Sequence, residues 1–255
     1  MSAQGRPGRL SKVLRLWHLC SLDAPCVTLL WTMYLAPAHR VAWPVGCALF
    51  AAVWIIYAGD RLLDARAGDE RLAQRHHFHW KHRRAFLVGI AVASLLLAAS
   101  LAWMEAELRL HLMLLSVPMF AYAAAVHGTR LRKKLPKELA TGAFFAFAVC
   151  LAAGAELRNA WPLALLCALN CAWIAQWEAE RANPFPALLT LPFSLMLVCI
   201  ASCAIAASPA SDPCAVAAGC LLALHLARRR MAPLTLRAAA DLALLAPILW
   251  WLPRP

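Results

Sequence analysis

The sequence has few charged residues. Asp, Glu, Lys and Arg make up 15% of the 255 residues, and 13 are acidic against 25 that are basic. Apolar residues contribute 63%, well above the roughly 45–50% of an ordinary soluble domain. The composition therefore excludes a typical soluble enzyme and predicts an all-α polytopic membrane protein.

The sequence also lacks a CxxC pair and a small-x-small cleavage site after its first apolar run. Without CxxC pairs, the ten scattered cysteines are expected to be small buried residues rather than disulfides or a zinc site. Without a cleavage site, we expect the first apolar run to be retained as a helix rather than removed as a signal peptide.

Long apolar runs fill the rest of the chain. A membrane span needs about 20 apolar residues, so this length allows about nine transmembrane helices. We expect a basic N-terminal segment at 1–21, then one transmembrane domain at 22–252, whose first run is interrupted at its start by Asp23. The expected spans are 22–38, 41–60, 85–104, 110–127, 138–156, 161–177, 187–207, 213–227 and 238–252.

Basic residues alternate between the loops of this map. With a cytoplasmic N-terminus, 21 of the 25 fall inside, and only Arg40, Arg109, Arg158 and Arg254 fall outside. This is the positive-inside pattern of an odd number of spans. The predicted location is the inner membrane of the cell, and the basic loops are expected to contact anionic lipid rather than nucleic acid.

Two acidic segments end spans on the predicted cytoplasmic side. Asp60 and Asp64 lie four residues apart, on one helix face, and such a pair suits a hard cation. The alternative is local pairing with Arg61 and Arg66. The second segment, 170–181, contains Asn170, Gln176, Glu178 and Glu180. Its alternative is an interfacial helix end with Trp173 and Trp177 in the membrane belt.

A basic run and a histidine run complete the candidate segments. Arg132, Lys133 and Lys134 precede Gly142, which would permit close helix packing or a polar head group. The run could clamp phosphate oxygens or serve only to orient the chain. Residues 76–82 contain four histidines that could suggest a metal, but a basic, pH-sensitive cytoplasmic loop is the preferred interpretation.

Together these segments resemble the UbiA superfamily of intramembrane prenyltransferases. The resemblance covers nearly the whole chain in topology and implies a UbiA-like bundle with its active site on the cytoplasmic side. Asp60 and Asp64 match the last two aspartates of the family's NxxxDxxxD motif. The chain departs from the family in two respects. Ile56 replaces the asparagine of the first motif, and the second motif has glutamates and Gln176 but no aspartate.

The resemblance implies a prenyltransferase that moves an isoprenoid chain from its diphosphate to a hydrophobic aromatic or lipid acceptor. Asp60, Asp64 and Lys133 would be catalytic. Asp60, Asp64, Glu178 and Glu180 would hold Mg²⁺, and Arg61, Arg132, Lys133 and Lys134 would bind the diphosphate. The departures leave open an alternative, a catalytically impaired UbiA-like protein with a lipid-binding or assembly role.

Two other classes are less consistent with the sequence. A CDP-alcohol phosphotransferase needs a DG pair, an AR pair and a glycine upstream of its DxxxD, and Tyr57, Ala58 and Gly59 precede Asp60 instead. A transporter is disfavoured because no repeated pair of broken helices is visible.

Overall fold

The computed structural model describes residue 13 and residues 16–66, 74–128, 137–182 and 190–251. Over these ranges the chain is helical and contains no strand. The principal helices are α2 (Asp23–Leu35), α3 (Trp43–Arg66), α4 (Gln74–Lys81), α5 (Arg83–Trp103), α6 (Ala106–Gly128), α7 (Lys137–Ala153), α8 (Ala160–Ala182), α9 (Thr190–Ala206), α10 (Ser211–Ala227), α11 (Pro233–Ala243) and α12 (Ile248–Trp251). Three single 3₁₀ turns lie at Pro37–His39, Leu157–Asn159 and Arg228–Arg230.

Within the described ranges, four helical segments are long and apolar enough to cross a membrane. They are Trp43–Arg66, Arg83–Trp103, Ala106–Ala125 and Leu157–Glu178. Each of the nine expected spans contains helical residues. The expectation of apolar helices is therefore confirmed, whereas nine crossings and a cytoplasmic N-terminus stay predictions.

Two segments differ from the expected map. The expected loop at 76–82 lies mostly in α4, which packs against α3 and α5. The expected span 238–252 is not one helix, because α11 ends at Ala243 and turns precede α12 around Pro247. Proline cannot donate the backbone hydrogen bond that a continuous helix needs.

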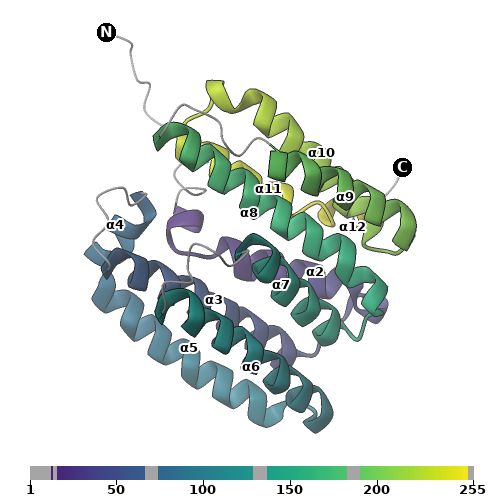
Figure 1. Cartoon of the computed structure of the whole chain (residues 1–255). Coiled ribbons are helices and arrows are strands. Elements are labelled where there is room, and N and C mark those ends of the chain that lie inside the picture. The colour runs from purple at the N-terminus through teal and green to yellow at the C-terminus, as the bar shows by residue number, and fades with distance from the viewer. Residues whose placement is uncertain (1–12, 14–15, 67–73, 129–136, 183–189, 252–255) are drawn as a thin grey trace.

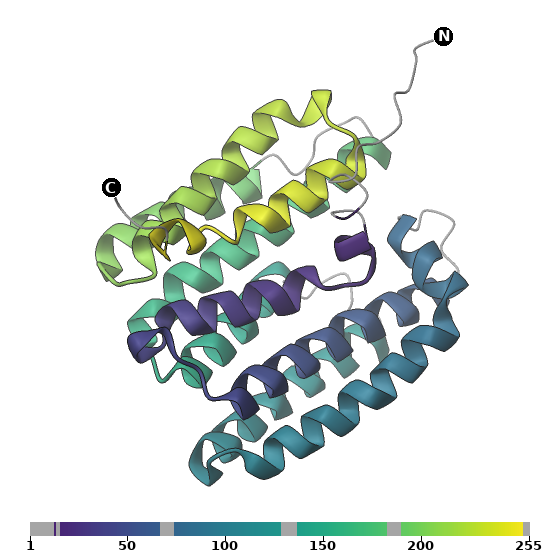
Figure 2. The ribbon, with the colours of Figure 1, turned by 180° about the vertical axis from the view of Figure 1, so that it is seen from behind.

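Helices that follow one another in the chain mostly pack side by side (Figure 1). Helix α11 packs back against α2, and in both views α2 lies between α3 and the α8–α11 part (Figure 2). The tryptophan Nε1 of Trp31 in α2 donates a hydrogen bond to Leu244 O, 2.9 Å away. This bond joins the first long apolar segment to the last.

Helices α7 and α8 approach each other closely at Gly142. A Cβ added there would lie 2.3 Å from Ala164 O and 2.9 Å from Ala168 N. The predicted role of Gly142 in close packing is confirmed. Helix α8 is consequently central to the core, and Leu163, Leu166, Leu169 and Trp173 on it are fully buried.

Candidate functional site

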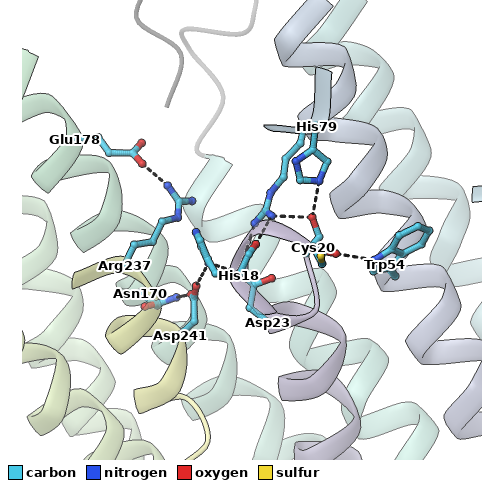
Figure 3. Close-up of polar contacts among 11 residues, drawn as sticks. His18, Cys20, Asp23, Trp54, His79, Asn170, Glu178, Arg237 and Asp241 are labelled. Carbon is cyan, nitrogen blue, oxygen red and sulfur yellow. Dashed lines mark hydrogen bonds and ion pairs between the residues drawn. The ribbon is translucent and has the colours of Figure 1, made fainter. Parts of the chain in front are cut away.

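A buried histidine and two aspartates meet at one end of the bundle. His18 belongs to the helical turn at residues 16–19 before α2, Asp23 begins α2, and Asp241 lies in α11. His18 Nδ1 is 2.8 Å from Asp23 Oδ2 and 3.2 Å from Asp241 Oδ2. Figure 3 shows the three side chains converging. His18 is completely buried, Asp23 is 3% exposed, and the Asp241 side chain is 13% exposed.

Arg61 of α3 fixes the turn that carries His18. Its Nη1 donates to His18 O at 2.9 Å and to Ser21 Oγ at 2.7 Å. Its Nη2 lies 3.5 Å from Asp23 Oδ2. Ser21 has a φ of 58°, a left-handed conformation that a non-glycine residue adopts only when its surroundings impose it. The hydrogen bond to the Ser21 hydroxyl holds that conformation in place.

His79 of α4 reinforces the same turn from the other side. His79 Nε2 and Ser21 Oγ share a hydrogen bond of 3.0 Å, and the His79 ring stacks on Phe86 at a centroid distance of 3.9 Å. The side chain is completely buried. His79 is thus a packing residue, which explains why the histidine-rich segment forms a helix here rather than a loop.

Two carboxylates determine the charge of His18. Burial alone would lower the pKa of His18, but contact with Asp23 and Asp241 outweighs burial, and the pKa is raised above its usual value. Arg61, 3.5 Å from Asp23, and His18 together oppose the negative charge of the two carboxylates. This balance accounts for charged groups so far inside the bundle, since buried charges need partners.

The cluster forms the polar end of an internal cavity. The cavity measures about 50 Å³, which is room for a few water molecules. Helices α2, α3, α7, α8 and α11 supply its lining: Asp23, Ala24, Val27, Tyr57, Thr141, Phe145, Cys167, Asn170, Cys171, Asp241 and Leu244. The site therefore combines polar groups at one end with apolar walls.

Some polar atoms of the cluster have no hydrogen-bond partner within the described ranges. They are His18 Nε2, Asp23 Oδ1 and Asn170 Oδ1, whereas His18 Nδ1 has its two ion pairs. The Asn170 amide nitrogen donates to Asp241 Oδ1 at 3.4 Å, and the residue is 6% exposed. Unpaired buried polar atoms are costly, and those on Asp23 and Asn170 border the cavity.

Asp60 and Asp64 lie on the last turns of α3, beside this cluster. Asp60 is exposed and Asp64 is half-buried. Arg61, the residue between them that was predicted to bind diphosphate, is 4% exposed and points to His18, Ser21 and Asp23. The two acids of α3 are therefore accessible to solvent, whereas Arg61 faces the interior of the bundle.

Glu178 of α8 lies on the side of His18 that is away from Trp54 of α3 (Figure 3). It forms an ion pair with Arg237, which precedes Asp241 by one turn of α11. Gln176 is buried. Glu180 lies in α8 with its side chain outside the described part, and Arg132, Lys133 and Lys134 lie outside the described residues altogether.

Sequence reasoning missed the cluster of His18, Asp23 and Asp241. Its members are single residues separated by up to 223 positions, so no local spacing marks them. The available signal was that Asp23 and Asp241 are ionisable residues inside expected spans, where such residues usually have a function. No protein-family model, curated protein or solved structure matches this chain.

Proposed function

We propose that this protein is a UbiA-like prenyltransferase of the inner membrane, with its active site on the cytoplasmic side. One observation carries the proposal: carboxylates lie on the last turns of both α3 and α8, close to the buried cluster at the polar end of the cavity. Asp60 adjoins Arg61, which bonds the His18 turn, and Glu178 pairs with Arg237, one turn from Asp241. The cavity, about 50 Å³ in volume, would have to widen to admit an isoprenoid chain.

The chemistry of the two aspartates fits magnesium. Mg²⁺ prefers oxygen ligands and retains several waters, and Asp60 and Asp64 supply carboxylates at a solvent-accessible helix end. Glu178 can join them only by giving up its ion pair with Arg237. When bound, Mg²⁺ would supply positive charge to the diphosphate of the isoprenoid donor.

The other residues of the proposed site have separate tasks. The basic residues Arg132, Lys133 and Lys134 would bind phosphate oxygens and stabilise the charge that grows on the leaving diphosphate. The apolar wall around Val27, Phe145 and Leu244 would exclude water from the allylic cation until the acceptor attacks it.

A catalytically impaired protein with a lipid-binding or assembly role is the second candidate. The ion pair between Glu178 and Arg237 favours it, because this pair neutralises the one acid of the second segment whose side chain is described. In this case the cavity and the basic residues would bind a lipid, and no diphosphate would be released.

One assay separates the two candidates. Purified protein receives Mg²⁺ and labelled isoprenoid diphosphates of several lengths, and released diphosphate is measured. We expect release to be lost in Asp60→Asn and Asp64→Asn. Asp212→Asn is the matched control. Asp212 lies in the first turn of α10, close in sequence to Pro209, whose carbonyl accepts a hydrogen bond from Tyr34. Absence of Mg²⁺-dependent release from the unmodified protein, with every donor and with hydrophobic acceptors supplied, would refute the transferase.

A further inference from the structure

The His18 cluster has the arrangement of a metal site distinct from the proposed magnesium site. One potential ligand atom from each of His18, Asp23 and Asp241 lies within 4.8 Å of the other two. Ligand atoms bound to a tetrahedral Zn²⁺ at about 2.0–2.2 Å lie about 3.3–3.6 Å from one another. The distance of 3.2 Å from His18 Nδ1 to Asp241 is close to that spacing, and the distance of 2.8 Å to Asp23 would lengthen by about half an ångström on ligation.

The orientation of His18 allows ligation in place of its ion pairs. Nδ1 faces both carboxylates, at 2.8 Å from Asp23 Oδ2 and 3.2 Å from Asp241 Oδ2. One N–H cannot serve two acceptors well. A dication would take the place of the proton between Nδ1 and the two carboxylates, because metal binding releases protons from its ligands.

Asn170 supplies an independent observation. Its Nδ2 donates to Asp241 Oδ1 at 3.4 Å, an outer contact of the kind that orients a ligating carboxylate. Its Oδ1 is buried without a partner among the described residues, and the residue lines the cavity with Asp23 and Asp241. This leaves an unused oxygen beside the cluster and an open side facing the cavity.

The donor set indicates the class of metal. One imidazole nitrogen and two carboxylate oxygens suit a first-row transition dication better than Mg²⁺, which prefers oxygen ligands alone. We propose that His18, Asp23 and Asp241 bind a first-row transition-metal dication such as Zn²⁺, with Asn170 as the outer residue that positions Asp241.

The loaded site would attract an anion from the cavity. The carboxylates of Asp23 and Asp241 would neutralise the two charges of the dication. The loaded site would then carry one net positive charge, that of Arg61, which lies 3.5 Å from Asp23. A site with three protein ligands and an open position is typical of catalytic rather than structural zinc. The site does not depend on Asp60 or Asp64, so it stands apart from the proposed function.

Metal titration of the purified full-length protein tests the proposal. The protein is stripped with a chelator and titrated with Co²⁺, whose visible absorption reports ligation, and then with Zn²⁺ in competition. We expect one tight Zn²⁺ per chain by elemental analysis. Asn170→Ala should weaken binding about 10–100-fold, as loss of an outer contact does, and Asp241→Asn and His18→Gln should weaken binding further.

Two controls exclude adventitious binding. Asp212→Asn changes an aspartate outside the cluster, and the double variant His77→Gln with His82→Gln removes exposed histidines of the α4 region. Both should bind Zn²⁺ normally. Binding that survives Asp241→Asn and His18→Gln but is lost in the double histidine variant would overturn the proposal, as would a stripped protein that takes up no Zn²⁺.

Two further measurements keep the result interpretable. Helical circular dichroism and gel filtration establish that each variant is folded. If Asp241→Asn is unfolded, His18→Gln decides the outcome. Asp60→Asn should keep Zn²⁺ binding while abolishing Mg²⁺-dependent diphosphate release, so failure of either proposal leaves the other intact.

Discussion

Helices α5 and α6 differ from α8 in where they place their apolar side chains. Large apolar residues of α5 and α6 point outward; among them Leu95 is 73% exposed and Val117 is 64% exposed. None of the residues in the apolar stretch of α6 is buried, whereas 72% of the residues in the apolar stretch at Leu157–Glu178 are buried. Helix α8 instead buries Asn170 and Gln176 together with its leucines. Apolar groups outside and polar groups inside are the arrangement that a lipid solvent favours.

The largest effect is expected at the centre of the buried side. Trp173→Ala should lower the free energy of unfolding by about 3–5 kcal/mol, because it removes a fully buried ring and leaves a cavity. Unfolding in mixed micelles of increasing sodium dodecyl sulfate measures the change. Trp103→Ala, at a residue 75% exposed, is the control, and equal losses in the two variants would contradict the contrast.

A charge on the outer side tests whether that side faces lipid. Leu95→Arg should disfavour insertion of α5 by about 2.5–3.5 kcal/mol, the cost of arginine at the centre of a membrane helix. A glycosylation-based insertion assay measures this cost. The comparison variant is Leu95→Ala, which should insert normally; unimpaired insertion of Leu95→Arg would place this face in water.

Close packing of α7 on α8 should tolerate no added methyl group. Gly142→Ala should destabilise the protein by about 1–3 kcal/mol through overpacking, since the new Cβ would meet the backbone at Ala164. The same micelle titration applies. Gly219→Ala in α10 meets nothing within 4 Å and should be neutral or slightly stabilising.

The smallest effect is expected at the bond between α2 and the segment after α11. Trp31→Phe keeps most of the ring but removes the donor to Leu244 O. One lost hydrogen bond corresponds to about 1 kcal/mol. Trp161→Phe is the control, at a residue that is 61% exposed. It should lower the free energy of unfolding in micelles less than Trp31→Phe does. Equal losses in the two variants would show that the hydrogen bond from Trp31 to Leu244 O does not stabilise the fold.

The helices were predictable because long apolar runs mark them directly. Helix α4 was not, since Gln74–Lys81 is polar and owes its form to contacts such as His79 on Phe86. The break after Ala243 was also missed, although Pro247 marked a place where a continuous helix is disfavoured.

The candidate site was predictable only where its residues are close in sequence. The spacing of Asp60 and Asp64 points to a shared helix face from local geometry alone. The meeting of His18 with Asp241 depends on how α11 packs against α2, which local spacing does not encode. Arg61 shows the same limit, because its neighbours indicated a solvent-facing role and the packing turns it inward.

Because Asp23 and Asp241 are far apart in sequence, the His18 cluster forms in steps as the chain is synthesised. A ribosome synthesises Asp23 and Arg61 early, and these two can pair as soon as α2 and α3 meet. Asp241 is synthesised only after α3 to α10, with the Leu244 carbonyl that Trp31 bonds. The cluster is therefore completed only when α11 has been made, and a nascent chain truncated before α11 would leave His18 with one carboxylate instead of two.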